Sequence, residues 1–175
     1  MTAKKFLNSL ANGKKDILQI FLDILAKTRT KYCVIGGLAV NAYAEPVVSL
    51  DLDIIIAVGQ IKGIIDAAAA KGLKAKKFEH SVNLNSPDSD LRIQIQTDAR
   101  YQDFIPRASV KTILGYKMKV AAVKDVLQGK IWAYFDEQRR MSKRQKDLAD
   151  IMRLIESHPA LVSIVPAALK KRIGI

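Results

Sequence analysis

The segment that most constrains the fold of this chain covers residues 32–56, where two apolar runs flank a pair of glycines. The runs over 31–35 and 52–58 are short and rich in Val, Ile and Leu, which is typical of buried strands. Gly36 and Gly37 follow the first run directly, and glycine is the residue that allows a tight turn or a close approach of the backbone to a ligand. The segment therefore predicts two core strands joined through a glycine turn and a short helix.

Two carboxylates stand at the entrance to the second run. Side chains two residues apart on a strand point to the same face, so Asp51 and Asp53 should lie side by side. Uncompensated, the pair would repel and one pKa would rise. A hard cation such as Mg2+ or Mn2+ would keep both ionised, because these ions prefer carboxylate and phosphate oxygens. A glycine turn that opens a helix offers free N–H groups to phosphate. The segment thus predicts metal on Asp51 and Asp53, with phosphate at Gly36 and Gly37; Ser49 would bond either a phosphate or its own backbone.

This pattern is similar to that of the nucleotidyltransferase superfamily. The shared elements are the glycine pair, a short helix, and then Ser49, Asp51 and Asp53 on a [Ser/Thr]-x-Asp-x-Asp strand. The chain resembles in particular a small bacterial branch that includes toxin-type nucleotidyltransferases. Residues 129–151, GKIWAYFDEQRRMSKRQKDLADI, resemble the lysine-bearing helix and the Lys-Asp-x-x-Asp-Ile helix that follow the catalytic domain there. The resemblance covers roughly residues 30–155, and the combination of spacings makes it fairly specific.

The resemblance implies a fold and an activity. The fold would be α/β (α+β), a mixed sheet covered by helices, with a nucleotidyltransferase-like domain over 1–121 and a helical region over 122–175 packed on it. The activity would be Mg2+-dependent transfer of a nucleoside monophosphate from an NTP to an acceptor hydroxyl on RNA or protein. A cytoplasmic bacterial protein, with a toxin–antitoxin-like role, would fit this branch.

Gln94 is where the chain departs from the family pattern. Residues 91–97 alternate apolar and polar side chains, which predicts a strand with one buried face. Active family members carry a third carboxylate on the matching strand, and the aligned residue here is Gln94. A neutral amide is a poorer Mg2+ ligand and not a general base, and a general base contributes typically ~100–10,000-fold. Asp90 or Asp98 would replace it if the strand were shifted; otherwise both are turn acids. Gln94 therefore also favours an alternative: a catalytically degenerate nucleotide- or RNA-binding module that acts with a partner protein.

The later helices carry further candidates. Lys130 would contact phosphate, as the lysine-bearing helix implies, or would be a solvated lysine. Asp147 and Asp150 are interpreted as acids that lock helices together through salt bridges. A basic cluster around them would bind RNA or a triphosphate tail, or would be a solvated face. The cluster comprises Arg139, Arg140, Lys143, Arg144 and Lys146.

The charge distribution fits an anionic ligand. The chain of 175 residues has a net charge of +12. Residues 1–31 contribute +5, residues 32–110 contribute −1 and residues 111–175 contribute +8. Basic segments that fold beside the acidic site would attract polyphosphate or RNA, although the same charges also serve solubility. No apolar run reaches the ~20 residues of a membrane helix, the N-terminus lacks the apolar region of a signal peptide, and the lone Cys33 reads as a buried apolar residue.

Periodicity and turn residues predict the remaining elements. They predict helices over 16–27, 37–44, 61–71, 124–137 and 143–157, a short helix after Pro166, one or two strands within 73–85 and a last strand over 116–120.

Overall fold

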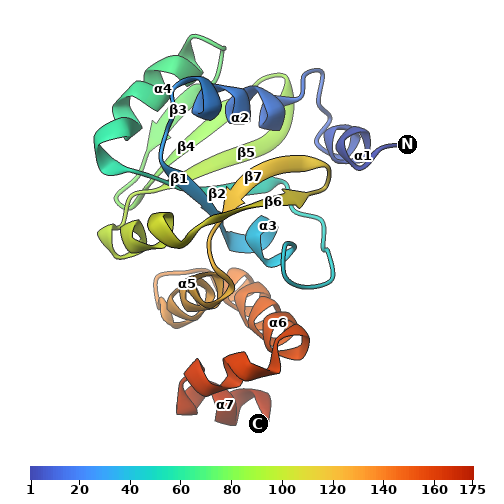
Figure 1. Ribbon diagram of the computed structural model, residues 1–175, viewed down its shortest axis with the longest axis vertical. Helices are drawn as coiled ribbons and strands as arrows, with labels where there is room; N and C mark the ends of the chain where they lie inside the picture. The colour runs from blue at the N-terminus through green and yellow to red at the C-terminus, as the bar shows by residue number, and fades with distance from the viewer.

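The computed structural model describes residues 1–175 and is built on one seven-stranded mixed sheet in the order β3-β4-β5-β2-β1-β7-β6 (Figure 1). The strands are β1 (Tyr32–Ile35), β2 (Asp51–Ile56), β3 (Lys74–Lys77), β4 (Ser81–Ser86), β5 (Ser89–Gln96), β6 (Ser109–Ile113) and β7 (Tyr116–Val120). The helices are α1 (Ala3–Leu10), α2 (Ile17–Lys27), α3 (Gly36–Val40), α4 (Ile61–Ala69), α5 (Val123–Phe135), α6 (Met141–Ser157) and α7 (Ala167–Ile173). Three 3-10 segments, η1 (Val58–Gln60), η2 (Ala99–Arg107) and η3 (Pro159–Ile164), complete the chain.

The two predicted core strands lie at the centre of the sheet. β1 and β2 pair antiparallel, which places Ile35 opposite Asp53. β2 and β5 pair parallel, with Asp51 opposite Arg92 and Asp53 opposite Gln94. β5 also pairs antiparallel with β4, the strand before it, which places Gln94 opposite Asn83. The acids of β2 and the polar side chains of β5 therefore share one face of the sheet.

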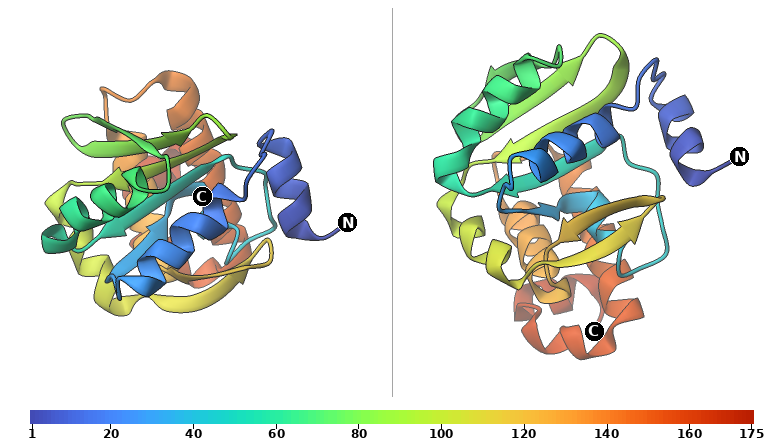
Figure 2. Two further views of the ribbon diagram at one scale, coloured as in Figure 1. Left: turned by 90° about the horizontal axis from the view of Figure 1, so that it is seen from above. Right: turned by 45° about the horizontal axis from the view of Figure 1, so that its top comes forward.

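The other face of these strands is aliphatic and packs beneath two helices. Leu52 and Ile54 of β2 and Ile93 and Ile95 of β5 are fully buried. Helices α2 and α4 lie together over one face of the sheet, and α5 and α6 lie on the opposite side (Figure 2). Because α3 leaves β1 toward α5 and α6, the polar face of β2 meets these later helices. This arrangement brings the sequence around residue 130 to the acids at 51 and 53.

Most sequence-predicted elements are confirmed. The predicted helix over 16–27 is α2, whose first turn is capped by the Asp16 carboxylate accepting from the Gln19 backbone N–H. The segment 73–85 contains two strands, β3 and β4. The predicted helix over 37–44 ends early, at Val40, and continues as turns up to Glu45.

No prediction covered α1, β6, η2 or η3. Helix α1 is only eight residues long and buries only Leu7. Segment η2 begins where the Asp98 carboxylate accepts from the Arg100 N–H, and it buries Tyr101 and Phe104 beside α5. Its two aromatic residues are spaced three apart within an otherwise polar stretch, which gives no signal for a long helix. None of the helices combines the length and apolar character needed to cross a membrane.

Candidate functional site

The site begins where β1 ends and the glycine pair starts. Gly36 has a φ of +70°, a conformation that costs L side chains about 1–2 kcal/mol. A Cβ added there would lie 2.1 Å from Asp53 Oδ2. Gly36 is therefore needed for two reasons, its backbone conformation and the close approach of the Asp53 carboxylate. The glycine turn and the acidic strand predicted from the sequence are in direct contact.

Asp53 opens onto a polar pocket between the sheet and α5. The pocket has a volume of about 80 Å3, well above the roughly 10–15 Å3 that one water requires. Its wall includes Gly36, Asp53, Gln94, Tyr101, Lys130 and Arg139. Four sequence-predicted site residues, Gly36, Asp53, Gln94 and Lys130, therefore meet at one pocket. Tyr101 comes from η2, and burial raises its pKa to about 12, so its hydroxyl stays protonated at neutral pH.

Asp53 is the most electrostatically perturbed carboxylate of this pocket. Burial raises its pKa above the usual 3.8, Lys130 lowers it, and Asp51 raises it again. The Asp53 side chain is half-buried, and no protein donor hydrogen-bonds to its carboxylate. A carboxylate that lines a pocket and has a pKa raised by desolvation is a typical feature of functional sites. A cation beside Asp53 would favour its ionised form.

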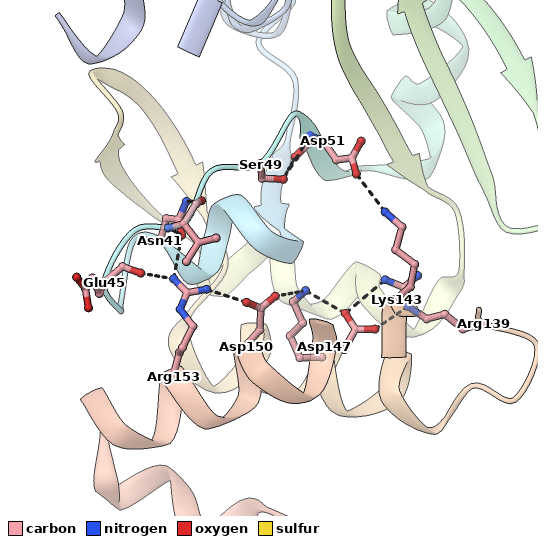
Figure 3. Close-up of polar contacts among 11 residues, drawn as sticks. Asn41, Glu45, Ser49, Asp51, Arg139, Lys143, Asp147, Asp150 and Arg153 are labelled. Atoms are coloured by element: carbon pink, nitrogen blue, oxygen red, sulfur yellow. Dashed lines mark hydrogen bonds and ion pairs between the residues drawn. The ribbon is translucent and has the colours of Figure 1, made fainter. Parts of the chain in front are cut away.

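Asp51 points to the same face but is already engaged. Its Oδ1 accepts a hydrogen bond from Arg92 Nη2 at 2.8 Å, and its Oδ2 lies 3.7 Å from Lys143 Nζ. Figure 3 shows Lys143 reaching from α6 to this carboxylate. Arg92 is its direct cross-strand neighbour on β5. Both oxygens of Asp51 thus face protein cations.

Lys130 belongs to a buried ion-pair network between α5 and α6. Its ammonium lies 3.1 Å from Asp147 Oδ1 and 2.7 Å from Asp150 Oδ2. Arg139 also bonds Asp147, at 2.6 Å from Nε to Oδ2 (Figure 3). Burial lowers the pKa of Lys130, but the carboxylates of Asp150 and Asp147 outweigh it and the pKa is raised. The interpretation of Asp147 and Asp150 as helix-locking acids is confirmed.

Ser49 and Gly37 lie beside each other, outside the Asp53 pocket. Ser49 is buried, and its hydroxyl bonds the backbone of Asp51, at 3.3 Å to the N–H and 3.4 Å to the carbonyl oxygen. A Cβ on Gly37 would lie 3.6 Å from Ser49 Oγ, an ordinary contact. In this state the Ser49 hydroxyl fixes the start of β2, which is one of the two roles expected from the sequence.

The basic cluster divides into members with different partners. Arg139 is paired with Asp147, Arg144 Nε donates to the Tyr134 carbonyl at 2.7 Å, and Lys143 faces Asp51. Arg140 and Lys146 are exposed. The acids outside the β2 pair serve strand ends: Asp90 accepts from Asn12, and Asp98 pairs with Arg100.

Sequence reasoning missed Arg92, the closest cation to Asp51. A signal was present, because Arg92 shares the polar face of its strand with Gln94 and lies two residues before it. If position 94 aligns with Asp53, a parallel register places position 92 beside Asp51. Tyr101 was also missed, and no motif in the sequence points to it.

The donor set around β2 is compatible with a metal that arrives with a nucleotide. No group of three or more His, Cys, Asp or Glu side chains is placed to hold an ion. Mg2+, however, usually takes one or two carboxylates and completes its shell with water and substrate phosphates. Asp53, half-buried and without a protein donor, is the residue whose chemistry fits such an ion. Asp51 fits it once its own cations move.

Comparison with known proteins relates this fold to nucleotidyltransferases. No protein-family model matches the sequence, and no curated protein matches it. The solution structure of the antibiotic-resistance factor ANT(2'')-Ia is similar, with a TM-score of 0.65 and 11% identity over 90% of this chain and 91% of that one. The lincomycin-bound lincosamide antibiotic adenylyltransferase LnuA gives 0.57 and 12%, over 81% of this chain and 98% of that one.

A third structure extends the comparison beyond antibiotic adenylyltransferases. An antigenic nucleotidyltransferase-like protein from Paracoccidioides brasiliensis gives a TM-score of 0.53 and 14% identity, over 86% of this chain and 75% of that one. These identities establish likeness of fold. The α/β architecture with a mixed sheet that the sequence predicted is confirmed, and it is the fold of nucleotidyltransferases.

Proposed function

We propose that this protein is a nucleotidyltransferase that moves a nucleoside monophosphate from an NTP to an acceptor hydroxyl on RNA or protein. The observation that carries the proposal is Asp53, a half-buried carboxylate without a protein donor, held against Gly36 and facing a polar pocket. The shared fold with ANT(2'')-Ia and LnuA supports nucleotidyl transfer as the general chemistry. The sequence resemblance to the toxin-type branch supports a macromolecular acceptor.

Asp51 and Asp53 would hold a Mg2+ or Mn2+ ion. When bound, such an ion neutralises charge on the triphosphate and helps to orient an in-line displacement. Gly36 and Gly37, with Ser49 beside them, would fix the phosphates through backbone N–H groups and a hydroxyl. Lys130 would contribute its positive charge from the pocket wall, since its ammonium is held in place by two carboxylates.

Gln94 supports a second candidate function. It lies directly opposite Asp53, where the family pattern places a third carboxylate, so the pocket lacks an evident general base. A protein with this site would bind nucleotide or RNA through the same residues without turnover and act through a partner.

Transfer of label from α-labelled NTPs tests the proposal. We would incubate wild type and Asp53→Asn with each NTP, Mg2+ or Mn2+, and RNA and protein fractions separately. Label should appear in one fraction with wild type and not with Asp53→Asn. Nucleotide binding without label transfer, in either metal, would instead favour the binding module. Wild type that neither binds nucleotide nor transfers label would exclude both functions.

A further inference from the structure

The strongest unassigned feature of the molecule is the pair of cations on Asp51. Arg92 and Lys143 come from different elements, β5 and α6, yet they face the two oxygens of one carboxylate. A metal ion bound to Asp51 would need the same oxygens. The cations and the metal therefore compete for Asp51, and one must leave when the other arrives.

Arg92 and Lys143 pair with a partly exposed carboxylate, in contrast to the other basic residues of the site, which pair with buried ones. The side chains of Arg92 and Lys143 are each 40% exposed, whereas that of Lys130 is 8% exposed and lies between two buried carboxylates. Arg139 forms two hydrogen bonds to Asp147. If Lys130 or Arg139 moved, buried aspartates would lose an ion-pair partner, whereas movement of Arg92 and Lys143 would release only Asp51.

Arg92 also carries an unused donor. Its Nη2 bonds Asp51, but its Nε is buried with no acceptor. A guanidinium presents its N–H groups as a planar fork, and phosphate oxygens accept from that fork in pairs. A phosphate placed beside Arg92 would satisfy the buried Nε–H, which no protein atom does.

The charge balance of the whole site points to the same ligand. Its four carboxylates are Asp51, Asp53, Asp147 and Asp150. The five cations that pair with them are Arg92, Lys130, Arg139, Lys143 and Arg153, which lies 2.7 Å from Asp150 Oδ1 on the same helix. The sum is +1 before any ligand binds, so a bare divalent ion would enter a site that is already positive. A metal–triphosphate complex is anionic and would restore the balance.

We propose that Arg92 and Lys143 are the polyphosphate-binding residues of this site. Without ligand they occupy the two Asp51 oxygens that a metal would use. When a metal–polyphosphate complex binds, the metal takes Asp51 and the two cations move to the phosphates. This inference rests on the proposed function for its ligand. It makes metal and polyphosphate binding mutually dependent: the metal takes Asp51 only when phosphates take the two cations.

The test measures how one substitution changes the affinities for two ligands, which should change in opposite directions. We would measure Mn2+ alone, by electron paramagnetic resonance, and Mg2+–tripolyphosphate, by calorimetry, on wild type, Arg92→Gln and Lys143→Gln. Each variant should bind Mg2+–tripolyphosphate at least roughly tenfold more weakly, the loss of one charge-assisted hydrogen bond. Each should bind Mn2+ alone more tightly than wild type, because Asp51 is freed.

Lys124→Gln is the matched control, since it removes one positive charge from an exposed residue of α5. It should change neither affinity measurably, and thermal unfolding of every variant shows that each is folded. Arg92→Gln or Lys143→Gln that weakens both ligands, or leaves both unchanged, would overturn the inference. Failure of the proposed function would give a different result: wild type would transfer no nucleotide, while the two variants would still bind Mn2+ more tightly than wild type.

Discussion

Replacing Gly36 by alanine should both destabilise the protein and disable its site, whereas the same change at Gly37 should not destabilise the protein. At Gly36 an L side chain with a φ of +70° costs about 1–2 kcal/mol. In addition, the new Cβ would lie 2.1 Å from Asp53 Oδ2 and 2.8 Å from Asp53 Cβ, so the acid must shift. At Gly37 the Cβ would have only an ordinary 3.6 Å contact with Ser49, within a helix.

The two alanine substitutions should change the stability of the protein in opposite directions. In a chain of this size 1 kcal/mol shifts Tm by roughly 2–4 °C. Gly36→Ala should therefore lower Tm by about 2–8 °C from backbone strain alone, and further by the displacement of Asp53. Gly37→Ala should raise stability by about 0.4–1 kcal/mol, because alanine has less conformational freedom to lose on folding. Thermal and urea unfolding, followed by circular dichroism, measures both changes.

A double-mutant cycle separates strain from steric conflict. In an Asp53→Ala background, Gly36→Ala should cost less than in wild type, because the carboxyl oxygen closest to the new Cβ is gone. Gly36→Ala should also lose the thermal stabilisation that Mg2+–NTP gives wild type, while Gly37→Ala keeps its fold. Equal effects of the two alanines on stability would refute the reasoning, as would a Gly36→Ala protein as stable as wild type.

Four further outcomes are expected. Asp53→Asn should stabilise the ligand-free protein at pH 7, because burial raises the Asp53 pKa and makes its ionised form unfavourable. This gain in stability should fade as the pH falls through the folded-state pKa toward 3.8, and differential scanning calorimetry at a series of pH values measures it. Lys130→Met should cost up to about 3–5 kcal/mol in urea unfolding, because it removes the cation that two buried carboxylates share and leaves each of them with one arginine. Gln94→Glu should create or raise Mg2+-dependent transfer in the label assay, up to ~100–10,000-fold for a restored general base. RNA binding, measured by fluorescence anisotropy, should weaken with salt at a slope of about −0.7 in log K per phosphate contacted and weaken again in Arg140→Glu/Lys146→Glu; binding insensitive to salt would make these residues ordinary surface charges.

The centre of this fold could be predicted from the sequence because its signals are local. The apolar runs at 31–35 and 52–58 and the alternation at 91–97 fix strand identity and facing without reference to distant residues. Strand alternation also places Asp51 and Asp53 on one face, and the register confirms that they share it. Helix α1 and segment η2 were not predicted because α1 is only eight residues long and η2 is a 3-10 segment that contains Pro106.

The partners of the site residues could not be predicted in the same way. Lys130 has no local sequence neighbour that reveals its two carboxylates, which lie 17 and 20 residues later and come close only when α6 packs on α5. Arg92 bonds Asp51 across 41 residues. Residue type and spacing therefore indicate which groups reach a site, while the ion pairs that decide which cation is free to bind a ligand depend on helix packing.

The surroundings of Gln94 give a physical reason for an amide, and not a carboxylate, at this position. It is the direct cross-strand neighbour of Asp53, and neighbouring strands lie about 4.8 Å apart. Asp53 already has a pKa raised by burial, and Asp51 raises it further. A third carboxylate at position 94 would add a like charge to a pocket in which Arg92 and Lys143 are committed to Asp51. Gln94→Glu should therefore lower the stability of the ligand-free protein and enlarge its thermal response to Mg2+, so the substitution that restores a base also makes folding depend on the metal.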